Sequence, residues 1–106
     1  MGDFSTIYKI LKYIERSMDY DEFDKEHFTA AHFRVTKARF FYLLQALTDA
    51  GYITGVKCME FAGNEKEIAL ISPRLTIPGL EYLSESAMMK KAYKAAKGIK
   101  DILPGA

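Results

Sequence analysis

Histidine and cysteine, which often ligate metal ions or act as base and nucleophile in catalysis, are scarce in this sequence. Its two histidines, His27 and His32, are five residues apart. Helix residues three or four apart share a face, so this spacing separates the two imidazoles. Cys58 is the single cysteine and lies well beyond both, whereas a zinc site needs a complete set of such ligands. We expect no metal site and interpret Cys58 as a small apolar strand residue.

The glycines do not form a phosphate-binding loop. Gly51, Gly55, Gly63 and Gly79 are spread among expected turns, while nucleotide-binding loops concentrate their glycines within a few residues. The sequence also offers no nucleophile beside a base and no carboxylate pair suited to acid–base work. The expectation is a protein that is not an enzyme and binds no cofactor.

Recognition of nucleic acid is the chemistry that the sequence favours, in the segment 35–53, VTKARFFYLLQALTDAGYI. In a helix-turn-helix protein, the first residues of the second helix contact base edges and flanking residues hold phosphates. Lys37 and Arg39 could bind phosphate or guanine, and Gln45 could bind adenine. Arg34, in the preceding turn, could reach the DNA backbone. A basic helix face that is merely solvated is the alternative.

Three consecutive aromatic residues complicate this prediction. Phe40 falls on the apolar stripe of the expected helix, but Phe41 and Tyr42 lie beside it. Outside thymine-methyl or intercalating contacts, aromatic side chains have little to do in a DNA groove. They suit a protein partner or a crowded core. The residues expected to contact DNA or a protein partner are Arg34, Thr36, Lys37, Arg39, Phe41, Tyr42 and Gln45.

Charge is balanced over the chain but uneven along it. Fifteen Lys and Arg against fourteen Asp and Glu give a net charge of +1, so any attraction to nucleic acid must be local. Residues 18–26 carry five acids and residues 27–48 carry none. Further on, Glu60, Glu65 and Glu67 outnumber the nearby lysines, and this stretch is expected to repel phosphate.

Apolar spacing predicts the elements that position these residues. Residues 5–18 are expected to form an amphipathic helix, and residues 25–33, KEHFTAAHF, a short one with Phe28 and Ala31 facing inward. A turn then leads to a third helix, which Thr36 caps and Gly51 ends by adopting a left-handed conformation. The apolar stripe of this third helix consists of Phe40, Leu43, Leu44 and Leu47.

Strand-like runs follow, at about residues 52–72, and flank Gly63-Asn64, a pair suited to a tight hairpin turn. A helical extension is expected at about residues 77–103, with Thr76 as its cap, Pro78 in its first turn, and an interruption at Ser84 or Ser86. Its last helix carries a lysine stripe on one side, namely Lys90, Lys94 and Lys97. The other side is expected to pack within the chain or to form a homodimer, through Met88 or Met89, Ala92, Tyr93, Ala96 and Ile99.

Length and composition predict a single domain. At 106 residues and 49% hydrophobic, the chain can form one core. A lone cysteine fits a reducing compartment, and neither a secretory leader nor an apolar run of membrane-spanning length is evident. We expect a cytoplasmic protein.

The order of three helices, a hairpin and a further helix is that of a winged helix-turn-helix domain with an additional C-terminal helix, mostly α, over residues 1–106. LLQALTDAGYI resembles the end of a recognition helix entering the first strand of a wing, and ALISPRLTIPGLEYL resembles the second wing strand entering the next helix. Together with MMKKAYKAAKGIKDILPG, these segments resemble the YjcQ family, small proteins associated with phages and prophages. That family has no established activity, so the resemblance implies a fold and no site residues.

Two functions therefore remain open at this point. The leading hypothesis is a small phage- or prophage-type winged-helix protein that binds double-stranded DNA and regulates transcription. The alternative is a protein–protein interaction module that uses the same scaffold without binding DNA.

Overall fold

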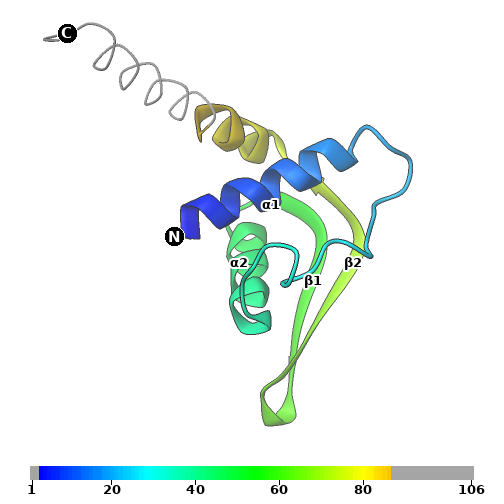
Figure 1. Ribbon diagram of the computed structural model, residues 1–106, viewed down its shortest axis with the longest axis vertical. Coiled ribbons are helices and arrows are strands. Elements are labelled where there is room, and N and C mark those ends of the chain that lie inside the picture. The colour runs from blue at the N-terminus through cyan, green and yellow to red at the C-terminus, as the bar shows by residue number, and fades with distance from the viewer. Residues whose placement is uncertain (1–2, 87–106) are drawn as a thin grey trace, which may run out of the picture.

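The computed structural model describes residues 3–86, which form three helices and a two-stranded antiparallel hairpin (Figure 1). The order is α1 (Asp3–Ser17), α2 (Lys37–Asp49), β1 (Ile53–Phe61) and β2 (Glu65–Leu75), and residues 77–86 are helical. This part of the chain is mixed α/β, not mostly α as predicted. The predicted last helix, its lysine stripe and its dimer face lie outside the described residues.

α1 contributes one side of the core through Ile10, Leu11 and Ile14, which are fully buried. Their steps of one and three residues lie on one helix face, as the amphipathic pattern predicted. α1 packs against β2, and α2 packs against β1. In Figure 1, α1 crosses above α2 and one end of the hairpin, while the hairpin tip projects beyond α2.

The predicted second helix at residues 25–33 is wrong. The segment forms a series of turns that leads directly into α2. Phe28 and Ala30 are both buried, whereas Ala31, which was expected to face inward, is exposed. Residues two apart point to nearly opposite sides of a helix, so a regular helix could not bury both. The turns let them both reach the core, together with Phe33.

α2 begins and ends as the sequence predicted. The Thr36 hydroxyl accepts a hydrogen bond from the backbone N–H of Arg39 at 3.0 Å, which caps the first turn. Gly51 follows the last turn with φ of 79°, in the left-handed region that glycine adopts without strain. All four residues of the predicted stripe are buried: Phe40, Leu43, Leu44 and Leu47.

The hairpin is confirmed and extends to Leu75, slightly beyond the predicted range. Gly63 and Asn64 both have positive φ at its turn, as the tight connection requires. A bulge shifts the strand register between Thr54 and Val56. Gly55, within the bulge, has φ of 78°, and a Cβ there would lie 1.9 Å from the carbonyl oxygen of Ser72.

The helix at 77–86 is held to the end of α2 by Thr76. Its hydroxyl donates to the Gly51 carbonyl and accepts from the backbone N–H of Gly79. The latter contact confirms the predicted cap, whereas Ser84 lies within the helix, so no interruption occurs there. Within residues 3–86, no helix combines the length and apolarity that a membrane crossing requires.

Candidate functional site

The outer face of α2 carries small and polar side chains. Ala38, Tyr42 and Ala46 are exposed along it, spaced by four residues, and Gln45 beside them is half-buried. Lys37 is exposed in the first turn. Residues four apart share one helix face, so Tyr42 is the one large side chain on a surface otherwise suited to close approach.

Phe41 does not belong to that face, which corrects the sequence prediction. Its side chain is 1% exposed, so it offers almost no surface to DNA or to a protein partner. The cause is a second packing partner for α2, namely the hairpin: α2 packs against β1, the Cys58 thiol is 3.9 Å from the Phe41 backbone carbonyl oxygen, and Phe41 lines one groove with Lys66 and Ile68 of β2. A helix packed on two sides buries more than one stripe. Tyr42 remains 48% exposed.

Arg39 is exposed but already engaged. Its guanidinium Nη1 donates to both carboxylate oxygens of Asp3 in α1, over 2.8 and 2.7 Å. About half of each side chain is exposed, 54% for Arg39 and 51% for Asp3, so water screens the pair and it contributes only roughly 0.2–1 kcal/mol. A phosphate could therefore displace Asp3 at modest cost.

The two other predicted residues lie just before α2. Arg34 is exposed and has φ of 58°, which places it at the sharp turn that ends the preceding segment. Thr36 is exposed, but its hydroxyl oxygen accepts the capping hydrogen bond described above. Its observed role is to begin α2 at the right residue.

The hairpin contributes a residue to this face that the sequence pattern does not predict there. Lys66 places its Nζ 5.6 Å from the centroid of the Tyr42 ring, within the range of a cation–π contact. Lys66 and Ile68 both line the space beside α2, as expected for strand residues two apart. The same alternation turns Glu65 and Glu67 toward the opposite face.

Cross-strand pairing identifies the one acid that remains on the α2 side of the hairpin. Lys66 pairs with Glu60, and Ile68 pairs with Cys58, and paired residues share a face. No ion pair links Glu60 to Lys66 or to any other described residue. The predicted acidic repulsion from the hairpin is thus reduced from three carboxylates to one on this side.

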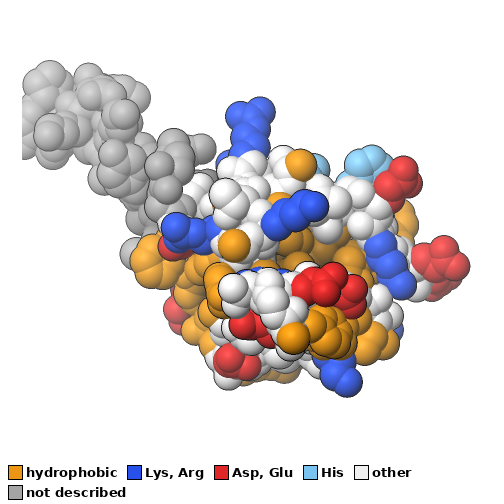
Figure 2. All heavy atoms as spheres, turned by 90° about the horizontal axis from the view of Figure 1, so that it is seen from below, with side chains coloured by type: hydrophobic (Ala, Val, Ile, Leu, Met, Phe, Trp, Pro, Cys, Tyr) orange, Lys and Arg blue, Asp and Glu red, His pale blue; other side chains and the backbone are white. Residues whose placement is uncertain are grey.

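A groove of about 590 Å³ lies between the first turns of α2, the segment just before it and the hairpin. Figure 2 looks onto the hairpin tip and shows hydrophobic side chains in a hollow behind it, with Lys and Arg side chains around the hollow and acidic ones at the tip. The apolar lining of the groove includes Val35, Ala38, Phe40, Phe41 and Ile68, and its polar lining includes Thr29, Lys37, Asn64 and Lys66.

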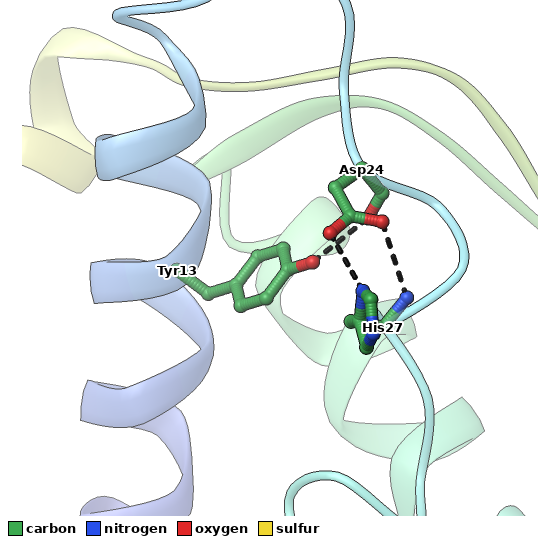
Figure 3. A network of polar contacts seen from close by, with 3 residues as sticks. All are labelled: Tyr13, Asp24 and His27. Carbon is green, nitrogen blue, oxygen red and sulfur yellow. Dashed lines mark hydrogen bonds and ion pairs between the residues drawn. The ribbon is translucent and has the colours of Figure 1, made fainter.

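The histidines and the cysteine occupy unrelated places. His27 Nδ1 lies 2.8 Å from Asp24 Oδ2, and the Tyr13 hydroxyl donates to the Asp24 carbonyl oxygen (Figure 3). The hydrogen bond with Asp24 raises the pKa of His27, and the same bond lowers the pKa of Asp24. Desolvation by burial, helped by the Asp24 charge, raises the pKa of Tyr13.

Cys58 is half-buried on β1 and packs against the core, as an apolar strand residue does. Burial is the main cause that raises the pKa of its thiol, and the Asp49 carboxylate adds to the effect. A raised thiol pKa disfavours the nucleophilic thiolate. In residues 3–86, no three His, Cys, Asp or Glu side chains are grouped so as to hold a metal ion.

Comparison with known proteins gives one finding. The model of the YjcQ protein family matches residues 8–102, which is most of the chain, so this chain belongs to the YjcQ family. No curated protein and no solved structure matches it significantly.

Proposed function

We propose that this member of the YjcQ family is a small phage- or prophage-type regulator that binds double-stranded DNA in the manner of a winged-helix protein. α2 enters the major groove through Ala38, Tyr42 and Gln45, and the hairpin serves as the wing. Turns take the place of the usual second helix. Buried residues of α1 and α2 belong to the same core cluster.

The observation that carries the proposal is the position of Lys66. It lies against Tyr42 on the outer face of α2, so a lysine from the hairpin joins Lys37 and Arg34 at the helix that carries no acid before Asp49. Phosphate contacts supply most of the affinity of DNA-binding proteins, whatever the base sequence. Local basic clustering of this kind compensates for the small net charge.

The burial of Phe41 also supports DNA over a protein partner. An exposed pair of aromatic rings would suit a protein interface, but only Tyr42 is available, beside two alanines. A tyrosine hydroxyl can bond to phosphate or to a base edge, and short side chains let a helix approach the bases closely. The surface is therefore better matched to a groove than to an apolar partner.

Single lysine substitutions, compared with a matched control, test the proposal. Lys37→Ala and Lys66→Ala should each weaken binding to duplex DNA at all sequences and reduce the salt slope by about one, because each removes a phosphate contact. Lys57→Ala is the matched control: it removes the same charge from the same hairpin, but Lys57 alternates with Cys58 and lies on the face turned away from α2. Equal effects of all three substitutions would mean that only net charge matters.

The groove favours one alternative, a protein-interaction module. Its apolar floor could receive a side chain of a partner, with Lys37 and Lys66 at its rim. Such a contact rests on buried apolar area and responds little to salt, in contrast to a contact with phosphates. Ile68→Ala, which removes apolar floor and no charge, should weaken the protein mode and leave DNA affinity nearly unchanged.

A further inference from the structure

A second concavity, about 920 Å³ in volume, lies between α1 and the loop that follows it. We call it the α1 basin. Its lining comes from α1, from residues 20–24, and from His32 and Phe33 just before α2. It shares no lining residue with the groove beside the hairpin. Its volume falls within the range of about 300–1,000 Å³ that is usual for small-molecule sites.

Aromatic rings form the floor of the basin. Tyr13, His32 and Phe33 meet nearly edge to face, with ring centroids 5.6 Å apart for Tyr13–His32, 5.8 Å for Tyr13–Phe33 and 4.9 Å for His32–Phe33. The Tyr13 hydroxyl crosses toward the loop and donates to the Asp24 carbonyl at 2.8 Å (Figure 3). Edge-to-face contact is a preferred geometry of aromatic pairs, so a further aromatic ring is suited to this cluster.

The two sides of the basin carry opposite charges. Lys9, Lys12 and Arg16 follow one face of α1 at steps of three and four. The loop opposite contributes Asp21, Glu22 and Asp24. The balance of three cations against three anions excludes a simple preference for anions or for cations.

The charges on the two sides do not neutralise each other directly. Lys12 pairs with Glu15 on its own helix, and Asp24 pairs with His27. Among the described residues, no ion pair engages Arg16 or Glu22, and none crosses the basin. A molecule that contacts both Arg16 and Glu22 therefore carries a negative and a positive charge. To pack on the aromatic rings as well, it needs a flat apolar group.

We propose that the α1 basin binds an aromatic amino acid. Its ring lies on the floor formed by Tyr13, His32 and Phe33, its carboxylate meets Arg16, and its ammonium group meets Glu22. A guanidinium recognises a carboxylate through parallel hydrogen bonds, and a carboxylate accepts hydrogen bonds from an ammonium group.

An occupant of the basin would contact a ring that is packed directly on α2. Phe33 stacks on Phe40 of α2, with centroids 5.7 Å apart and an interplanar angle of 22°. Ligand contact with Phe33 is thus one side chain away from the proposed DNA-binding helix. Any effect on DNA affinity rests on the proposed function, but binding of the amino acid does not.

The test is an NMR titration of the ¹⁵N-labelled full chain with L-phenylalanine. We expect saturable shifts of amides between Tyr8 and Asp24 and at His32 and Phe33, with a Kd on the order of 1 mM, given the small size of the ligand. Phenethylamine lacks the carboxylate and 3-phenylpropionate lacks the ammonium group. Each should bind about tenfold more weakly, because each loses one charge-assisted contact.

Two substitutions assign the contacts. Arg16→Gln should weaken L-phenylalanine and 3-phenylpropionate but not phenethylamine, and Glu22→Gln should weaken L-phenylalanine and phenethylamine but not 3-phenylpropionate. Lys57→Gln and Glu67→Gln, which remove a cation and an anion from the face of the hairpin turned away from α2, should alter none of the three. The proposal fails if no saturable shift occurs at about tenfold above the expected Kd, if the analogues bind as well as the amino acid, or if the shifts map to the groove beside the hairpin.

Discussion

Arg39 of α2 is tied to Asp3 of α1 by two hydrogen bonds from one guanidinium nitrogen, at 2.8 and 2.7 Å. The pair joins the first turns of two helices that are far apart in sequence. It also holds a cation of the proposed DNA surface against a carboxylate, so the proposed function requires Arg39 to exchange Asp3 for phosphate.

Removal of the Asp3 charge should therefore strengthen DNA binding. We expect Asp3→Asn to raise the affinity for duplex DNA several-fold at low salt and to leave the slope of the salt dependence nearly unchanged, because Arg39 contacts phosphate in both proteins but no longer has to leave a carboxylate. Fluorescence anisotropy with a labelled duplex at several salt concentrations measures both. The matched control is Asp19→Asn, which removes the same charge from an exposed acid that forms no ion pair with a described residue. Identical behaviour of the two variants would contradict a specific role for Arg39.

Phe41 and Tyr42 are neighbours in sequence with opposite roles. Phe41→Ala should lower the free energy of unfolding by roughly 3–5 kcal/mol, because it opens a cavity in the core. Tyr42→Ala should change stability by less than about 1 kcal/mol, since its ring is largely at the surface, while it weakens DNA binding. Urea unfolding gives the stabilities, with the exposed Tyr20→Ala as control. A strongly destabilised Tyr42→Ala would place that ring in the core instead.

Two glycines of the hairpin have the same backbone conformation and different surroundings. Gly55 and Gly63 both have φ of 78°, but only at Gly55 would a Cβ meet a backbone atom, 1.9 Å from the Ser72 oxygen. Both alanine substitutions cost about 1 kcal/mol for the left-handed backbone. Gly55→Ala should cost roughly 1–3 kcal/mol more, because the bulge must open. Equal free energies of unfolding would show that the strands do not approach each other so closely.

The His27–Asp24 pair should make the stability depend on pH in a defined direction. The pKa of His27 is raised above 6.5, so its contribution is complete below that pH and is lost as pH rises through the raised pKa. The pKa of Asp24 is lowered below 3.8, so its contribution is complete above that pH and is lost as pH falls through the lowered pKa. The pair is therefore strongest between these limits.

Histidine NMR titration measures this coupling. In the Asp24→Asn variant the pKa of His27 should fall back toward its ordinary value, because the carboxylate that stabilises the imidazolium is gone. The Tyr13 hydrogen bond uses the backbone carbonyl of Asp24 and should survive the substitution. An unchanged His27 titration would show that the contact is not maintained in solution.

Local signals in the sequence were sufficient for much of the fold. The Thr36 cap, the Gly51 stop and the Gly63-Asn64 turn each follow from one residue type with a particular backbone preference. The helix predicted at 25–33 is wrong because helical spacing alone does not determine how this segment packs. The need to bury Phe28 and Ala30 on one side overrides that spacing, and only the three-dimensional core reveals it.

The candidate site was only partly predictable for the same reason. Lys37 and Tyr42 are exposed as expected, since they lie off the apolar stripe of α2, and Arg34 is exposed in the turn before this helix. Phe41 is buried where α2 meets the hairpin, a contact between separate elements that helical periodicity does not contain. Strand alternation alone predicts that Lys66 and Ile68 share one face of the strand and that Glu65 and Glu67 lie on the other face. Nothing in the sequence, however, shows which face of the hairpin meets α2.

The most direct test of the central claim is a titration of the purified chain with random-sequence duplex DNA at low salt, followed by stepwise addition of salt. If Arg34, Lys37, Arg39 and Lys66 contact phosphates, binding should occur below ~100 μM and weaken roughly a hundredfold for a fourfold rise in salt, because about four counterions are released. The absence of binding at ~100 μM, where non-specific DNA-binding proteins normally respond, or an affinity that is indifferent to salt, would contradict DNA binding by this surface.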